Sequence, residues 1–465
     1  MRPTFTPRAL LLGILFACGW MGMPAEAAAQ IRVPFDAYTL DNGLSVILHE
    51  DHSAPVIAVV VMYHVGSKNE KPGRTGFAHL FEHMMFQGSD HVGDDEHFRL
   101  LQEVGGNVNG TTNNDRTNYF EVVPSNQLEL SLYLESDRMG FLLSAMTQEK
   151  LDNQRDVVKN ERRQNYDNQP YGRAWETIAR GLYGDTHPYG WPVIGSMDDL
   201  SAASLEDVKN FFRLYYAPNN AVLSVAGDFD SREARALIQK YFGPLPRGAA
   251  VPRPAPPPVK TDKEKRLVLE DRVQLPRLYM AWTSHPLNTR GDALMDVLTD
   301  ILSRGKNSRL YRTLVYDRQI AQSVSAYQYG MEIGGQLIID VTPKPGRTPA
   351  ELEEAVRVEI RRLLEEGVTE REIRTSLNNK EVDFIGARST VLGKANALAT
   401  YHTLTGDPGN FNSEFDRFTG ITREEVQNGA RDILGSPGLV LTIVPQGQQG
   451  KASPGGSKPP EGGLR

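Results

Sequence analysis

The chain has 465 residues, of which 51 are basic and 58 acidic, giving a net charge of −7. This acidic balance contains no basic block, which argues against nucleic acid as a partner. The single cysteine, Cys18, lies in an N-terminal leader, so the mature chain can form neither disulfides nor thiolate metal sites. Any metal must therefore be held by nitrogen and oxygen ligands.

The N-terminal leader has the layout of a secretory signal peptide. Two arginines precede an apolar run, Ala9 to Met23, which is short for a bilayer span, and small residues follow it. No later segment is apolar enough to cross a membrane. We predict that residues 1–29 are a signal peptide and that the mature protein is periplasmic or secreted. Lipidation of Cys18, which would make an outer-membrane lipoprotein, is the alternative.

The rest of the chain mixes strand and helix patterns, which predicts an α+β fold. Runs of alternating or continuous apolar residues predict strands at residues 44–50, 56–65 and 118–124. Helical periodicity predicts helices at residues 130–146 and 147–166.

The stretch "HLFEH", residues 79–83, holds two of the ten histidines. The apolar residues around it recur with helical spacing and form one stripe: Phe77, Leu80, Phe81, Met84 and Met85. His79, Glu82 and His83 then share the opposite face of a helix. Two neutral imidazoles at positions i and i+4 can share one zinc ion, and the glutamate can act as base on a metal-bound water. The alternative is a solvated polar face that happens to contain histidines.

The segment "NVNGTTNND", residues 107–115, predicts an exposed edge strand. Its polar side chains and the glycine at position 110 leave the backbone approachable. An extended peptide could add to this edge as an extra strand, held by backbone hydrogen bonds. A polar hairpin without a ligand is the alternative.

A catalytic zinc site usually has a third protein ligand. In the predicted helix 147–166, Glu161 comes four residues after Val157 and three after Val158, so it is predicted to point inward with these valines. A buried carboxylate is rarely left unpaired. Glu161 is therefore either the third ligand or the partner of a nearby arginine in an ion pair.

Seven prolines between residues 243 and 262 predict a semi-rigid linker. This linker separates an N-terminal domain, residues 30–242, from a C-terminal domain, residues 263–445, each of common domain size. The tail, residues 446–465, has little to bury and is predicted to be disordered.

The two predicted domains look like copies of one another. Residues 204–225 align without a gap with residues 422–443 at an offset of 218, and residues 78–88 align with residues 295–305 at an offset of 217. Two matches at nearly the same offset favour duplication. In the second match the histidine-bearing face is replaced by other polar residues: Asp296, Thr299 and Asp300. The C-terminal domain is therefore predicted to be metal-free.

The pattern His-x-x-Glu-His, followed 78 residues later by Glu161 in "DVVKNER", resembles the pitrilysin/insulinase family of inverted zincin metallopeptidases. The segments "GGNVNGTTNNDRTNY", "NQPYGRAWE" and "HPYGWPVIGSMDDL" are similar to segments of its bacterial and mitochondrial-processing-peptidase-like members. The resemblance covers residues 36–445. It implies two homologous α+β domains per chain, and chains or pairs of chains that close around a peptide-sized chamber.

The resemblance implies a zinc metalloendopeptidase with one Zn²⁺ per chain that cleaves peptides or unfolded segments. The positions that match the family are the zinc ligands His79, His83 and Glu161, the base Glu82, and the peptide-strand pair Asn109 and Gly110. Gln154 replaces a second glutamate of many relatives; it can hydrogen-bond around the metal site but supplies no charge. A non-catalytic assembly or peptide-binding subunit of the same fold is the alternative.

Many active relatives also carry an arginine and, seven residues later, a tyrosine in the second half. In residues 308–324 these positions are Val315 and Gln322, so both donors are missing. Arg309 and Tyr316 are also seven apart and are the substitute candidates for binding substrate. The resemblance therefore implies a heterodimer with a homologous zinc-free subunit that supplies the arginine and tyrosine; a homodimer is the alternative.

Overall fold

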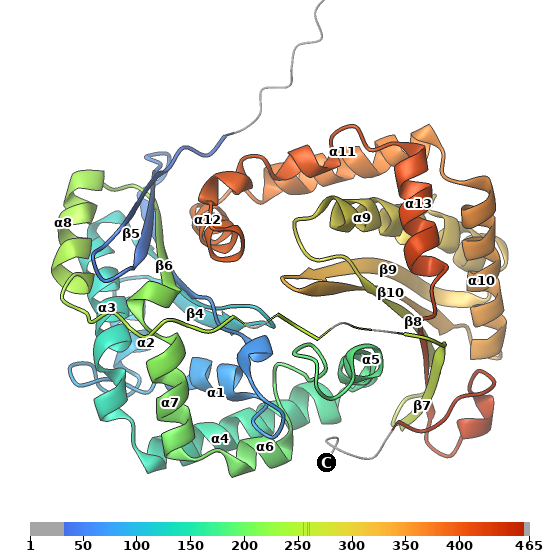
Figure 1. Ribbon diagram of the computed structural model, residues 1–465, viewed down its shortest axis with the longest axis horizontal. Helices are drawn as coiled ribbons and strands as arrows, with labels where there is room; N and C mark the ends of the chain where they lie inside the picture. The colour runs from blue at the N-terminus through green and yellow to red at the C-terminus, as the bar shows by residue number, and fades with distance from the viewer. Residues whose placement is uncertain (1–31, 254, 258, 260, 460–465) are drawn as a thin grey trace, which may run out of the picture. The chain divides into compact units, whose positions relative to one another are not determined.

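The computed structural model describes residues 32–253, 255–257, 259 and 261–459 (Figure 1). The predicted signal peptide, residues 1–29 with Cys18, lies outside this range. All the elements described below belong to one compact unit, Val33–Arg465. Among the described residues, no helix combines the length and the apolar character that a bilayer crossing requires.

The first half of the chain forms a six-stranded sheet. Its strands, in spatial order, are β1 (Asp36–Thr39), β2 (Ser45–Glu50), β6 (Ala221–Gly227), β3 (Val56–Tyr63), β5 (Thr117–Pro124) and β4 (Asn107–Thr112). The pair β2–β6 is parallel, and the other neighbouring pairs are antiparallel. The three strands predicted from apolar runs are β2, β3 and β5. The polar segment predicted as an edge strand is β4, which lies at the end of the sheet.

The second half forms a five-stranded sheet with the same topology. Its strands, in spatial order, are β7 (Lys265–Asp271), β11 (Leu439–Pro445), β8 (Arg277–Ser284), β10 (Gly334–Pro343) and β9 (Ala321–Met331). This order repeats β2-β6-β3-β5-β4 of the first sheet, and again only the first pair is parallel. The fold is α+β with duplicated halves, as the sequence predicts.

Helices flank both sheets. Those of the first half are α1 (Phe77–Met84), α2 (Glu96–Glu103), α3 (Leu128–Ala145), α4 (Gln148–Arg162), α5 (Ala174–Tyr183), α6 (Met197–Ala202), α7 (Leu205–Tyr215) and α8 (Ser231–Phe242). Those of the second half are α9 (Arg290–Ser303), α10 (Pro349–Glu366), α11 (Glu370–Gly386), α12 (Val391–Thr405) and α13 (Arg423–Leu434). The helices predicted at residues 130–146 and 147–166 correspond to α3 and α4.

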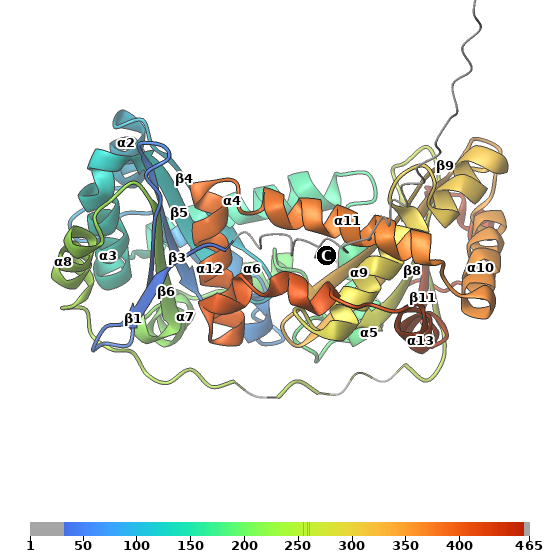
Figure 2. The ribbon, with the colours of Figure 1, turned by 90° about the horizontal axis from the view of Figure 1, so that it is seen from above.

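Each half contributes one helix to the sheet of the other half. Helix α12 packs Ala395, Leu398 and Ala399 against the face of the first sheet formed by residues of β2, β3 and β6. Helix α5 packs Ile178 and Leu182 against residues of β8, β10 and β11 in the second sheet. Both views place α12 beside the first sheet (Figures 1 and 2). This exchange explains why the central strands are buried on both faces.

The predicted disorder of the tail differs from the structure over residues 446–459. Ser457 accepts a hydrogen bond from the Val268 amide (2.9 Å) and donates one to the Arg266 carbonyl (3.1 Å). Because β7 is an edge strand, its unpaired backbone groups are available to the tail. Residues 460–465 lie outside the described range.

Candidate metal centre

Helix α1 carries the His-x-x-Glu-His motif, and its surroundings fix which way the motif faces. The side chain of Glu70 accepts hydrogen bonds from the amides of Gly76 (3.0 Å) and Ala78 (2.8 Å), so an acidic group caps the helix start. The predicted apolar stripe is buried: Phe77, Leu80, Phe81, Met84 and Met85. The motif is therefore presented on the opposite face of α1.

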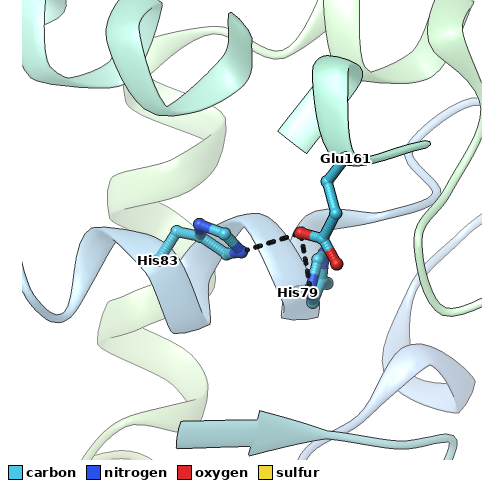
Figure 3. A group of neighbouring side chains, drawn as sticks. All are labelled: His79, His83 and Glu161. Atoms are coloured by element: carbon cyan, nitrogen blue, oxygen red, sulfur yellow. Dashed lines mark ion pairs between the residues drawn. The ribbon is translucent and has the colours of Figure 1, made fainter. Parts of the chain in front are cut away.

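The structure brings His79, His83 and Glu161 together (Figure 3). The Oε2 atom of Glu161 lies 3.7 Å from Nε2 of His79 and 3.4 Å from Nε2 of His83. A tetrahedral zinc ion with ligand distances of about 2.0–2.1 Å would hold its ligand atoms roughly 3.3 Å apart. Among the described residues, this is the one group of three or more metal-ligating side chains close enough to share an ion. The donor set and its spacing fit zinc.

Glu161 reaches this group from the edge of the buried face of α4. That face consists of Leu151, Gln154, Val158 and Arg162. The prediction that Val157 lies on the apolar side of the helix is wrong. Its side chain is not part of the buried face and is 41% exposed. Both imidazoles lie within 4 Å of the Glu161 carboxylate, whereas the adjacent Arg162 pairs with Glu176 (2.9 Å).

The protonation states favour cation binding. Burial, followed by the neighbouring imidazole of His83, lowers the pKa of His79 to about 4. The hydrogen bond with His83 is the main cause that lowers the pKa of Glu161. A neutral imidazole and an ionised carboxylate are the forms that can donate electron pairs to a metal ion.

The side chain of Glu82 extends from α1 toward Gly110 of β4. A Cβ atom placed on Gly110 would lie 3.1 Å from Cγ and 3.3 Å from Oε1 of Glu82, so the glycine allows the strand backbone to approach this carboxyl group. Its Oε2 atom is buried without a hydrogen-bond partner in the described chain. Burial raises the pKa of Glu82, and a hydrogen bond with Thr112 opposes this effect. A carboxylate with a raised pKa and a free oxygen is suited to accept a proton.

The other predicted site residues differ in their placement. Asn109 is exposed on β4, where its side-chain oxygen accepts a hydrogen bond from the backbone N–H of Gly110 (2.8 Å). Gln154 is buried on α4, two turns before Glu161. Arg309 forms an ion pair with Glu372 (2.7 Å), and Tyr316 is 73% exposed. The structure therefore does not bring Arg309 and Tyr316 to the metal group.

Two residues near the site were missed by the sequence reasoning. Arg116 is half-buried near Glu82. Burial lowers the pKa of its guanidinium, and the charge of Glu82 opposes this effect. The guanidinium donates a hydrogen bond to the carbonyl of Thr111 (2.8 Å). Tyr166 lies in a π-helical turn, Arg163–Asp167, that follows α4. Arg116 stands within the family-like segment and could have been found there. A π-helical turn has no comparable sequence signal.

Comparison with known proteins places the chain in a family. Residues 45–186 match the family model described as "Insulinase (Peptidase family M16)", and residues 202–380 match "Peptidase M16 inactive domain". The zinc protease PqqE of Helicobacter pylori is 31% identical over 386 residues, which cover 81% of this chain and 85% of that protein.

Solved structures agree with this assignment. A protease from Helicobacter pylori superimposes with a TM-score of 0.81 at 26% identity, covering 89% of this chain and 99% of that one. The first half of the periplasmic protease PqqL from Escherichia coli has a TM-score of 0.72 at 18% identity, covering 90% and 93% of the two chains, which shows the shared fold. The chain belongs to the insulinase family, peptidase family M16.

Proposed function

We propose that the protein is a zinc metalloendopeptidase that cleaves peptides or unfolded segments in a closed chamber. The observation that carries this proposal is the convergence of the His79, His83 and Glu161 donor atoms beside the buried carboxyl group of Glu82. All four positions are intact, which favours an enzyme over a non-catalytic assembly or peptide-binding subunit of the same fold.

Each residue has a distinct task in this proposal. His79, His83 and Glu161 would hold one zinc ion, which supplies Lewis-acid polarisation of a peptide carbonyl when bound. Glu82 would accept a proton from the attacking water through its free Oε2 atom and pass it to the leaving amine. Gln154, buried behind Glu161, would contribute a hydrogen bond around the metal rather than charge.

The substrate would lie along β4. This strand has a neighbour on one side only, so its other edge can pair with an extended peptide. Asn109 and Gly110 would form the part of this edge that contacts the peptide. Because Gly110 adjoins Glu82, a peptide on this strand would pass directly beside the base.

The proposed enzyme works in the periplasm or outside the cell, and needs a second subunit. A signal peptide at residues 1–29 and the resemblance to a periplasmic protease support export, and Cys18 lipidation is the alternative. The side chain of Arg309 is paired with Glu372 and that of Tyr316 is largely exposed, which favours a homologous zinc-free subunit that supplies an arginine and a tyrosine. A homodimer is the alternative. In this proposal the zinc-binding domain spans residues 30–242, and the linker 243–262 joins it to the metal-free domain, residues 263–445.

The direct test is peptide hydrolysis by the purified mature chain, alone and with the homologous zinc-free subunit. We expect hydrolysis that is abolished by a chelator, is restored by about one equivalent of zinc, and is faster with the second subunit at equal zinc occupancy. Absence of chelator-sensitive hydrolysis under both conditions would refute the enzymatic function. Full activity of the lone chain would refute the need for a heterodimer.

Replacing Glu161 with glutamine should weaken zinc binding by about tenfold or more, because the amide is a poorer ligand than a carboxylate. Zinc content after dialysis against a graded chelator series measures this effect. Glu149→Gln, on the exposed first turn of the same helix, is the matched control and should retain its zinc. If both variants keep the metal equally well, Glu161 is not a ligand.

A further inference from the structure

A cavity of about 320 Å³ lies where the two halves meet, and aromatic side chains dominate its lining. The first half contributes Tyr166, Trp175, Tyr189 and Trp191, and the second half contributes Tyr327 and Tyr329 of β9. A cavity of this volume can hold one large side chain, and aromatic linings favour apolar ligands.

Two lining residues connect this cavity to the elements of the proposed peptide site. Tyr166 follows Glu161 by five residues, and burial, followed by the charge of Glu161, raises the pKa of its phenol. Asn114, in the turn directly after β4, lines another wall. The cavity therefore lies between the end of the helix that carries Glu161 and the end of the strand that would hold the peptide.

The floor of the cavity is formed by Tyr189 and Trp191, which hydrogen bonds hold in place. The hydroxyl of Tyr189 donates to Asp115 (2.6 Å), and the indole N–H of Trp191 donates to the carbonyl of Ser67 (2.9 Å). Both side chains are buried. Because these polar groups are already satisfied, the floor offers apolar ring surface without demanding a hydrogen bond from a ligand.

The rim of the cavity, in contrast, consists of aromatic side chains that are partly exposed to solvent. Trp175 is 46% exposed and Tyr329 is 43% exposed. Trp175 contacts Tyr327 with 5.5 Å between ring centroids, so the rim rings from both halves adjoin one another. Exposed aromatic rings beside a preformed apolar cavity are typical of a binding site.

We propose that this cavity, which we call the aromatic pocket, binds one aromatic or large aliphatic side chain of the substrate. The inference rests on the proposed peptidase function. Gly110, beside Glu82, marks where the bond is cut, and Asn114 is four residues further along the same hairpin. At about 3.3 Å per residue, the occupant belongs to a substrate residue about three or four positions from the cleaved bond.

Acidic side chains are excluded from the aromatic pocket. Glu176 lines it; Arg162 holds its Oε2 atom (2.9 Å), whereas its Oε1 atom is buried without a hydrogen-bond partner in the described chain. An aspartate would lose water without gaining a cation, because the guanidinium of Arg162 is already paired with Glu176. We therefore expect the order of preference to be aromatic, then large aliphatic, then alanine, with aspartate lowest.

The test measures binding, so that it does not depend on turnover. Zinc-loaded Glu82→Gln protein is titrated with fluorescent alanine-rich peptides in which one phenylalanine is moved along the chain. We expect one register to bind about tenfold more tightly than the all-alanine peptide. Trp175→Ala and, separately, Tyr329→Ser should reduce this gain to less than about twofold while leaving the all-alanine peptide unaffected.

Phe141→Ala is the matched control, since Phe141 is a 40% exposed aromatic side chain on α3, outside the aromatic pocket. It should keep the phenylalanine preference. A preference that survives in both pocket variants, or no preference at any register, would overturn the inference. Absence of hydrolysis by the wild-type protein, with the preference intact, would refute the peptidase function and leave the aromatic pocket standing.

Discussion

The Glu82→Gln variant is expected to retain its zinc and to lose peptide hydrolysis by about a hundredfold to ten-thousandfold. Glutamine has nearly the same shape as glutamate but cannot accept the proton of the attacking water. Glu82 lies outside the group formed by His79, His83 and Glu161, so its charge is not needed to hold the metal. Zinc content and kcat, measured on the same preparation, separate the two effects.

Glu149→Gln again provides the matched control, because Glu149 is exposed on α4 and is not one of the proposed metal-site residues. It should change neither zinc content nor turnover. If Glu82→Gln retains wild-type kcat, another group must serve as the base. If it loses its zinc, the carboxyl group of Glu82 takes part in metal binding, and the assignment of the ligands is wrong.

The elements that position this site were predictable because their signals are local. The helical stripe around residues 79–83 determines which face of α1 is buried, and two histidines four apart must then share the other face. The polar, glycine-containing segment before β5 likewise predicts an edge strand from its own composition. The exposure of Val157 shows the limit of this reasoning, since two adjacent valines cannot both lie on one narrow buried face.

The exchange of α5 and α12 between the two sheets could not be predicted in this way. Helix α12 shows no single apolar face in its sequence, with alanine and glycine on several sides. Which sheet it covers depends on long-range connectivity, because either sheet offers a similar apolar surface. Hydrophobic periodicity gives the face that a helix buries but does not identify its partner.

Duplication allowed the chemistry of the second half to be predicted only in part. The alignment replaces the two histidines with Asp296 and Asp300, and the structure shows what these carboxylates contact. The ammonium of Lys380, from α11, lies 3.4 Å from Asp296 and 3.6 Å from Asp300. Burial raises the pKa of Asp296 to about 6, and the charge of Lys380 opposes this effect. In the second half, the ammonium group of Lys380 therefore pairs with the two carboxylates that replace the histidines of the zinc motif.

Helix α3 shows how burial can defeat sequence reasoning altogether. Its helical character was predicted, yet four consecutive polar residues inside it are buried: Glu135, Ser136, Asp137 and Arg138. Arg138 forms a salt bridge with Glu135, and its guanidinium lies 4.3 Å from the ring centroid of Tyr119. Glu121 of β5 is also fully buried beside Glu135. The pattern of charges along α3 indicates a solvated face, and only the opposing strand reveals a buried cluster.

The Arg138→Met variant is expected to lower the free energy of unfolding by about 3–5 kcal/mol. Methionine fills much of the same space, but Glu135 is left in the core without its cation. Burial, followed by the charge of Glu135, already raises the pKa of Glu121 well above its ordinary value of 4.5. A group whose pKa is raised on folding stabilises the protein below its unfolded pKa, and this contribution is lost as the pH rises. The loss caused by Arg138→Met should therefore be larger at pH 8 than at pH 5, because the charge of Arg138 lowers the pKa of Glu121, so removing the guanidinium makes ionisation of Glu121 still harder.

Urea unfolding at both pH values measures this difference. Arg99→Met is the matched control, since Arg99 pairs with Glu96 and Glu103 on the exposed surface of α2, and its replacement should change stability little at either pH. Adding Glu135→Gln to Arg138→Met should recover part of the loss, because the unpaired charge is then removed together with its partner. A loss in Arg138→Met that is no larger than in Arg99→Met, or that is equal at pH 5 and pH 8, would show that the buried cluster does not depend on this guanidinium for its charge balance.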